Sequence, residues 1–175
     1  MTDDYFKINE NELMNYFNYS GFLGKLKLRF KFLKTWILHS MAYSSPLPNL
    51  VVKLQCMRGV KIGNNCHISP YVQFDLLYPD QITIGNNVSI GTNSIIFAHS
   101  NMPANMELKK NAYPRKIKPV HIKSGAVIGP GTIITAGVTI GENAMTGVGS
   151  VVTQDVPNSC IAVGNPARVI KRIDE

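Results

Sequence analysis

Cysteines are scarce in this sequence of 175 residues: Cys56, Cys66 and Cys160 are odd in number and widely spaced. They lack the short paired spacing of a zinc site and do not suggest a disulfide framework. Long apolar runs are also missing, since no stretch of about 18 apolar residues is free of charge, and this argues against a membrane-spanning helix. The N-terminal acids and asparagines do not match a secretory signal. These absences predict a cytoplasmic protein.

Positive charge is concentrated in one part of the chain. The formal net charge is +7, and residues 21–60 contain five lysines and two arginines but no acid. The positive field therefore belongs mainly to an N-terminal arm. Net charge alone would suit a nucleic-acid partner, but interleaved aromatic residues and a recognised binding module are both missing. We therefore expect no nucleic-acid partner.

A six-residue period dominates the rest of the sequence. Apolar or β-branched residues recur at Ile62, Ile68, Phe74, Ile84, Ile90, Ile96, Ile122, Ile128, Ile134, Ile140, Thr146 and Val152. Small or β-branched residues follow four positions later at Val72, Val88, Ser94, Ala126, Thr132, Val138, Ala144, Ser150 and Val156. A helix repeats at three and four residues and a strand at two, so each hexad predicts a short strand followed by a turn. Three hexads then close a triangular coil, and stacked coils share one core.

The turns and the interruptions of this pattern carry further information. Gly63-Asn64-Asn65 and Gly85-Asn86-Asn87 are expected at corners, where positive φ costs these residues little. A β-sandwich would instead show irregular turn spacing of about 8 to 12 residues. The period breaks around Tyr78-Pro79 and again in an aperiodic loop at 102–119. A long loop in a compact repeat domain is usually functional or disordered, and we interpret this one as functional because of the residues that flank it.

The arm has two competing local patterns. Apolar residues between Phe22 and Leu38 recur at helical spacing, whereas Lys25 to Phe32 alternates as a strand would. We favour a helix because Trp36 extends the apolar stripe. Residues 21–40 would then make a peripheral contact with an anionic inner membrane surface, or the helix would cap the end of the repeat, and the two are compatible.

Several motifs resemble the hexapeptide-repeat acetyltransferases, and within them the maltose, galactoside and cell-surface polysaccharide O-acetyltransferases. They are Ile82-Thr-Ile-Gly-Asn-Asn-Val-Ser-Ile-Gly91, Phe97-Ala98-His99, Gly149-Ser-Val-Val-Thr-Gln-Asp-Val-Pro157 and Gly164-Asn-Pro-Ala-Arg168. The resemblance covers roughly residues 58–173 and implies a mainly β fold, a left-handed parallel β-helix. We thus expect a mainly helical arm at 1–57, a β-helix acyltransferase domain at 58–165 with a protruding loop at 102–119, and a C-terminal tail at 166–175.

The resemblance also implies a homotrimer with active sites between subunits, acetyl-CoA as cosubstrate and a sugar or glycan acceptor. His99 holds the position of the catalytic histidine, before the protruding loop. A neutral imidazole can take the proton of a sugar hydroxyl as that hydroxyl attacks the thioester. The expected activity is O-acetyl transfer to a sugar or surface-polysaccharide precursor. N-acylation of an amino sugar and a non-enzymatic β-helix scaffold are the alternatives.

The resemblance extends to individual binding positions. For the cofactor it points to Gly129, Pro130, Gly147, Val148, Thr153, Gln154, Arg168 and Lys171. Arg168 and Lys171 would meet the CoA phosphates, and the glycines would let pantetheine approach the backbone. Gln73 and Asp75 are candidates for binding the acceptor or for orienting His99, and Asp75 could instead cap a turn. Two departures are Val127, where relatives often have tryptophan, and Pro130, which offers no hydroxyl.

Metal chemistry is not expected. The γ-type carbonic anhydrases share the fold and hold zinc with three histidines, two of them about five residues apart, whereas His67, His99 and His121 are widely separated. The loop itself is basic, with Lys109, Lys110, Arg115, Lys116 and Lys118 against Glu107. It could bind the CoA phosphates or a phosphate-bearing acceptor, or be a solvated lid.

Overall fold

The structure, a computed structural model, describes residues 5–100 and 104–173. Three helices come first: α1 (Tyr5–Tyr16), α2 (Gly21–Tyr43) and α3 (Pro48–Arg58). Short strands follow: β1 (Lys61–Ile62), β2 (His67–Ile68), β3 (Gln73–Phe74), β4 (Ile82–Ile84), β5 (Ser89–Ile90), β6 (Ile95–Ile96), β7 (Val120–Ile122), β8 (Val127–Ile128), β9 (Ile133–Ile134), β10 (Thr139–Ile140), β11 (Met145–Thr146), β12 (Val151–Val152), β13 (Cys160–Gly164) and β14 (Ala167–Arg172). A 3₁₀ turn (Pro79–Gln81) and helix α4 (Met106–Asn111) occupy the two breaks in the period.

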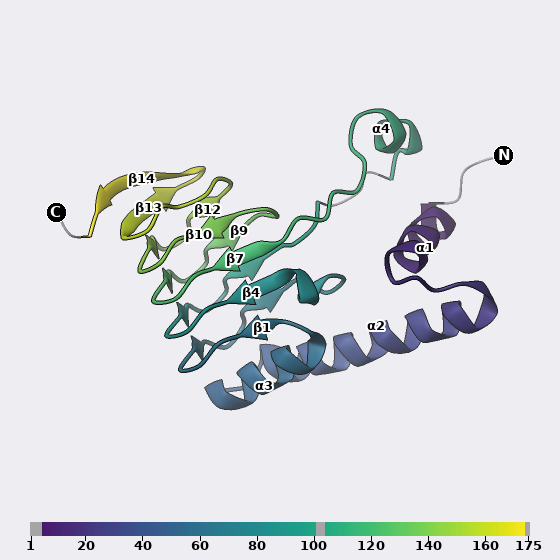
Figure 1. The fold of residues 1–175 in the computed structure, drawn as a ribbon, viewed down its shortest axis with the longest axis horizontal. Coiled ribbons are helices and arrows are strands. Elements are labelled where there is room, and N and C mark those ends of the chain that lie inside the picture. The colour runs from purple at the N-terminus through teal and green to yellow at the C-terminus, as the bar shows by residue number, and fades with distance from the viewer. Residues whose placement is uncertain (1–4, 101–103, 174–175) are drawn as a thin grey trace.

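The strands form three sheets that wrap into a coil. Their orders are β1-β4-β7-β10, β14-β13-β11-β8-β5-β2 and β12-β9-β6-β3. The neighbours within each sheet are parallel, except that β13 and β14 are antiparallel. Figure 1 shows the coils stacked from β1 at one end to β14 at the other. The chain therefore forms a parallel β-helix.

The register of the sheets places like residues above one another. Ile62 pairs with Ile84, Ile84 with Ile122, and Ile122 with Ile140. The equivalent column on a second side stacks Phe74, Ile96, Ile134 and Val152, none of which is more than 1% exposed. The small residues four positions later are buried as well. The hexad pattern is therefore confirmed as the inward-facing set.

The expected corner chemistry is also confirmed. Asn65 and Asn87 adopt φ of 54° and 57°, as predicted for the glycine-asparagine turns. A Cβ on Gly63 would lie 2.7 Å from the carbonyl oxygen of Gly85 in the next coil. Successive coils approach so closely here that only glycine fits.

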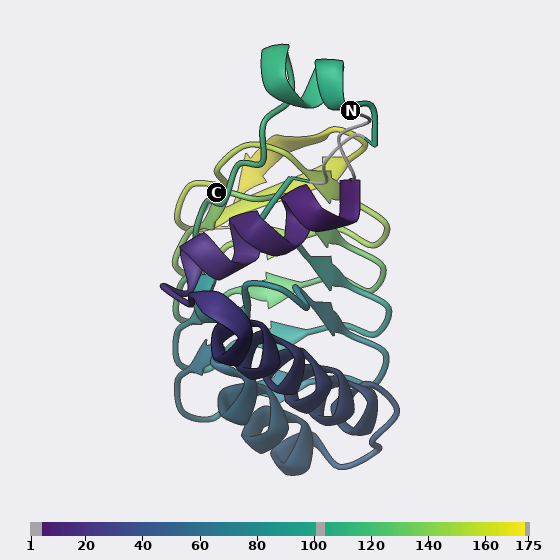
Figure 2. The same ribbon diagram turned by 90° about the vertical axis from the view of Figure 1, so that its right-hand side faces the viewer.

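The arm is helical, so the helix interpretation of Phe22 to Leu38 is confirmed. Helix α3 packs on β1 and β2 at the end of the stack, and α2 contacts α3 and β3. Figure 1 shows α2 extending sideways beyond the coils, and Figures 1 and 2 both show α1 above it. Leu38, Val51 and Leu54 belong to the same hydrophobic core as the β-helix. The expected capping of the first coil is thus observed.

The C-terminal region differs from expectation. Ala167–Arg172, expected within a tail, forms β14 and pairs with β13 as a hairpin. This hairpin extends one of the three sheets at the other end of the stack, where the edge of β11 would otherwise be unpaired. Within residues 5–100 and 104–173, no helix is long and apolar enough to cross a membrane.

Candidate active site

His99 lies at the neck of the protruding loop. It follows β6 and forms an antiparallel bridge with Ile117, where the loop returns. On either side, the backbone N–H of Ser100 donates to the carbonyl oxygen of Lys116, and that of Lys118 donates to Ala98, both at 2.9 Å. These hydrogen bonds join the two ends of the loop and fix the backbone of His99.

Asp75 of the neighbouring coil holds the imidazole. Its Oδ2 lies 2.5 Å from Nδ1 of His99, and its side chain has no exposed surface, whereas that of His99 is 11% exposed. A carboxylate only accepts hydrogen bonds, so it selects the tautomer with the proton on Nδ1. Nε2 is then left with a lone pair that can accept a proton.

Asp75 keeps its charge although it is buried. Burial by itself would raise its pKa, but the hydrogen bond from His99 and the backbone donors of Tyr78 and Ala98 outweigh it, and the pKa lies below the usual value. Oδ1 accepts from the N–H groups of Leu77 and Tyr78 at 2.9 and 3.0 Å, and Oδ2 also accepts from Ala98 at 2.9 Å. Asp75 thus orients His99 and caps a turn. Its side chain has no exposed surface, and contact with the acceptor stays a prediction.

Arg58 contacts the backbone of Asp75, an interaction that the sequence analysis did not predict. Its Nη2 donates to the backbone carbonyl of Asp75 at 2.7 Å, and its Nη1 donates to Gln55 at 2.5 Å and contacts His39 at 3.2 Å. Burial, only partly offset by the charge of Asp75, lowers the pKa of Arg58 to about 10. Burial and the charge of Arg58 lower the pKa of His39 to about 4. Composition had placed Arg58 among the surface charges of the arm.

Tyr78 packs against the other side of the imidazole. Its ring meets that of His99 edge-on, with centroids 5.2 Å apart and planes at 66°. The Tyr78 hydroxyl accepts a hydrogen bond from Arg115 of the loop at 2.6 Å. Burial raises the pKa of Tyr78, although Arg115 opposes the shift. In the sequence this residue was visible only as a break in the period.

The basic loop is partly neutralised by α1. Lys109 and Arg115 lie 2.6 and 3.4 Å from the carboxylate of Glu12, and Arg115 also donates to Asn9. Lys116 and Lys118 are exposed, and the side chain of Lys110 lies outside the described part of the chain. Some of the loop cations are therefore paired with α1, and others are exposed to solvent. Between the loop and α1 lies a cavity of about 440 Å³, lined by Glu12, Asn15, Tyr16, Tyr78, Pro114, Arg115 and Ile117.

The predicted cofactor residues flank one side of the β-helix, the β3-β6-β9-β12 sheet. Pro130 and Val148 are exposed at the corners that precede β9 and β12, and Thr153 and Gln154 are exposed at the corner that follows β12. His99 lies beyond the end of β6, on the same edge as Thr153. The outward side chains between these edges are apolar and half-buried: Ile95, Ile133 and Val151.

The hairpin places Arg168, one of the two predicted phosphate-binding cations, near the first of these edges. Arg168 of β14 pairs with Val163, and a Cβ on Gly147 would lie 2.6 Å from the side chain of Val163. Lys171 lies farther along β14, and both cations are exposed. A Cβ on Gly129 would lie 2.6 Å from the carbonyl oxygen of Thr146. Stacking of the coils thus requires these glycines, a reason that we had not foreseen.

Gln73 and the remaining histidines complete the predicted set. Gln73 is half-buried on β3 and lines a cavity of about 300 Å³ with His39, Ser40 and Tyr43 of α2. His67 and His121 are exposed. In the described part of the chain no group of three or more His, Cys, Asp or Glu side chains is arranged to hold a metal.

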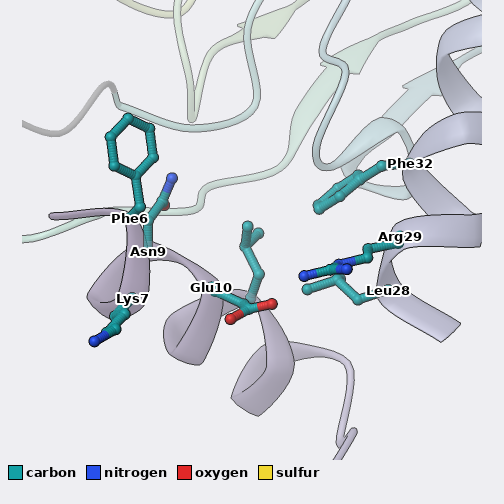
Figure 3. Close-up of a pocket in the computed structure, with 8 residues that line it drawn as sticks. Phe6, Lys7, Asn9, Glu10, Leu28, Arg29 and Phe32 are labelled. Atoms are coloured by element: carbon teal, nitrogen blue, oxygen red, sulfur yellow. The ribbon is translucent and has the colours of Figure 1, made fainter. Parts of the chain in front are cut away.

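A separate cavity of about 340 Å³ lies between α1 and α2. Its lining residues are Phe6, Lys7, Asn9, Glu10, Leu13, Leu28, Arg29 and Phe32. Figure 3 shows Arg29 and Phe32 extending from α2 toward Glu10 on α1. His99 is not among the lining residues, so this cavity is distinct from the candidate active site.

Known proteins are similar to this chain in sequence and in fold, although no protein-family model matches it. Galactoside O-acetyltransferase of Escherichia coli K12 is 38% identical over 117 residues, which are 65% of this chain and 57% of the relative. A putative acetyltransferase of Staphylococcus aureus Mu50 is 40% identical over 127 residues, 62% of this chain and 63% of the relative. The chain therefore spans about three fifths of the length of these two relatives.

Solved structures extend the comparison. A hexapeptide-repeat acetyltransferase from Vibrio cholerae superposes with a TM-score of 0.70 over 85% of this chain and 94% of its own, at 24% identity, which shows the shared fold. A galactoside acetyltransferase in complex with coenzyme A has a TM-score of 0.63 at 30% identity, over 83% of this chain and 82% of its own. The chain is a member of the hexapeptide-repeat acetyltransferase family, in the galactoside and maltose O-acetyltransferase branch, and its fold is a left-handed parallel β-helix.

Proposed function

We propose that this protein transfers an acetyl group from acetyl-CoA to a hydroxyl of a sugar or surface-polysaccharide precursor. The observation that carries the proposal is the buried Asp75 carboxylate 2.5 Å from Nδ1 of His99, at the edge of the β3-β6-β9-β12 sheet. This arrangement equips Nε2 as a general base. Galactoside O-acetyltransferase relatives and the coenzyme A complex of one such enzyme support the choice of reaction.

In the proposed reaction, Nε2 of His99 removes the proton of the acceptor hydroxyl as its oxygen attacks the thioester carbonyl carbon. The tetrahedral intermediate collapses with cleavage of the C–S bond. The departing CoA sulfur takes the proton back from the imidazolium, which returns His99 to its starting state. Asp75 holds the ring and stabilises the positive charge that forms on it.

The residues on the β3-β6-β9-β12 sheet fit acetyl-CoA. Ile95, Ile133 and Val151 offer an apolar floor to pantetheine, and Pro130, Val148, Thr153 and Gln154 border this floor. Arg168 and Lys171 are exposed on β14 and can meet the CoA phosphates, Arg168 through paired hydrogen bonds. A second chain of the proposed homotrimer would close this open side. The proposed location of the protein is the cytoplasm.

The acceptor would enter from the side of α1 and α2. Gln73 and the cavity lined by Glu12, Tyr16 and Arg115 offer polar groups to sugar hydroxyls. The exposed Lys116 and Lys118 would suit an acceptor that carries phosphate. The same base could serve an amino sugar, so mass spectrometry of the product, before and after mild alkali, distinguishes O-acetylation from N-acetylation.

Release of free thiol from acetyl-CoA in the presence of a panel of sugars tests the proposal. His99→Ala should lower kcat by roughly 10²- to 10⁴-fold, the usual contribution of a general base. The exposed His121→Ala is the matched control and should keep full turnover. Undiminished turnover by the His99→Ala variant would sink the assignment. Light scattering tests the trimer, and a monomer at micromolar concentration would contradict a site that is built from two chains.

A further inference from the structure

Helix α2 carries apolar side chains on two opposite faces. One face is buried and contains Leu28, Leu38 and Ala42. The other, which we call the outer stripe, is exposed and consists of Phe22, Leu23, Leu26, Phe30, Leu33, Ile37 and Met41, which are between 41% and 80% exposed. From Leu23 on, their spacing of three or four residues aligns them along one side of the helix, and Phe22 adjoins the start of this stripe. An isolated exposed apolar residue needs no explanation, but a continuous stripe of this length indicates a surface that another structure covers.

Cations border the outer stripe. At 100° per residue, Lys27 and Lys34 lie along one edge and Arg29 along the other, and all three are exposed. Lys25 and Lys31 are instead engaged on the packed side, with Glu10 at 3.0 Å and with the ring of Phe17 at 4.2 Å. The sequence has no acid between Glu12 and Asp75. The stripe therefore combines apolar area with a positive border.

Helix α2 projects from the rest of the molecule, so an extended flat partner can reach its exposed side. Figure 1 shows α2 projecting beyond the β-helix, and the cavity of Figure 3 lies between α2 and α1, with Arg29 and the exposed Phe6 among its lining residues. A helix with an apolar face, cationic edges and several aromatic residues has the composition of helices that lie in the plane of a membrane interface. An uncharged protein surface would not explain the two lysines, Lys27 and Lys34, beside the apolar face.

We propose that the outer stripe of α2 seats the protein on an anionic lipid bilayer, with the helix parallel to the membrane plane. The apolar side chains enter the boundary between headgroups and acyl chains, and Lys27 and Lys34 contact the lipid phosphates. This inference is independent of the acetyl transfer proposed above. It assigns a partner to a surface that the β-helix does not use.

Co-sedimentation of the full chain with phosphatidylcholine vesicles, with and without phosphatidylglycerol, tests the proposal. Binding is expected only to the anionic vesicles and should weaken as salt increases. Lys27→Gln combined with Lys34→Gln should lower the partition coefficient about 30-fold, and Phe30→Ser combined with Leu33→Ser at least about tenfold. Lys123→Gln and Leu108→Ser remove an exposed cation and an exposed leucine away from α2, and these controls should bind as the unchanged protein does.

Three results would overturn the proposal. The first is no binding of the folded protein to anionic vesicles, and the second is an equal loss of binding in the controls. The third is a change of molar mass in light scattering caused by the Phe30→Ser and Leu33→Ser pair, because the stripe would then be a contact between copies of this chain. Circular dichroism checks that each variant folds. The lysine pair provides a separate measurement if the apolar pair does not fold.

Discussion

At the scale of single residues, the charge of Asp75 is maintained by several donors around one carboxylate. Its two oxygens receive hydrogen bonds from His99 and from the backbone of Leu77, Tyr78 and Ala98. These donors stabilise the ionised form against the cost of burial. A carboxylate held in this way can fix the tautomer of His99 through the whole of the proposed reaction.

We predict that Asp75→Asn lowers kcat by about 10²-fold or more, with little change in the KM for acetyl-CoA. An amide no longer stabilises the imidazolium and can favour the wrong tautomer. The buried Asp75 does not reach the exposed residues that border the proposed CoA site. Steady-state kinetics with both substrates measure the effects on kcat and on KM separately. An increase in KM at constant kcat would show that Asp75 acts in binding instead.

His39 links stability to pH. Its pKa is about 4 in the folded protein, where it is buried beside Arg58, against about 6.5 in an unfolded chain. The unfolded state therefore binds the proton more tightly, so the free energy of unfolding falls as the pH falls from about 6.5 to about 4, by up to about 3 kcal/mol. Urea unfolding across this range measures the slope.

The control for this prediction is another histidine. His39→Gln, which keeps an acceptor for Arg58, should flatten the slope between pH 6.5 and 4. His67→Gln, at an exposed position, should leave it almost unchanged. A slope that persists in the His39→Gln variant would assign the pH dependence to other groups.

At the scale of elements, helix α1 and the protruding loop stabilise each other. Glu12 of α1 meets Lys109 and Arg115 of the loop, and Arg115 reaches on to Tyr78 beside His99. Partly buried ion pairs that share one acid lose more than a single contact when that acid is removed. Glu12 therefore connects the arm with the side of the active site.

We predict that Glu12→Gln makes the loop more open to trypsin at Lys109 and Arg115. The variant leaves the two cations without their carboxylate, so the loop should separate from α1 more often. Limited proteolysis followed by mass spectrometry locates the cleavage. Glu10→Gln is the matched control, because Glu10 pairs with Lys25 of α2 and not with the loop. Equal cleavage of both variants would argue against stabilisation of the loop by Glu12.

At the scale of the whole molecule, the arm and the β-helix share one core. Val51 and Leu54 of α3 are buried in the same cluster as Val60, Phe74 and Tyr78. A continuous core favours a single cooperative transition over separate unfolding of two domains. The division at residue 57 that the sequence suggested thus marks a change of secondary structure within one core.

We predict that α3 and the β-helix open together. Under native conditions, hydrogen exchange of peptides from 48–58 and from 120–152 should show similar free energies of opening. Val51→Ala should lower both, because a cavity at the end of the stack weakens the shared core. If the 48–58 peptide exchanged at a much lower free energy, the arm would be a separate unit.

The sequence by itself determined the β-helix. A period of six residues allows few structures, and the stacked columns of Ile84, Ile122 and Ile140 follow directly from it. The position of His99 before a long loop was predictable for the same reason, since the loop interrupts a strict repeat. The helical arm followed from spacing that extended beyond its alternating part.

Only the tertiary structure decided how His99 is supported and where the loop cations go. Arg58 donates to the backbone of Asp75, and Glu12 pairs with Arg115. The six-residue repeat does not relate the positions of these residues in the sequence. The sequence shows such residues only as surface charge, because burial is set by the packing of helices against coils and not by local pattern. The same holds for the outer stripe of α2. Spacing predicted an amphipathic helix, but its packing against α1, α3 and β3 determined which apolar face stayed exposed.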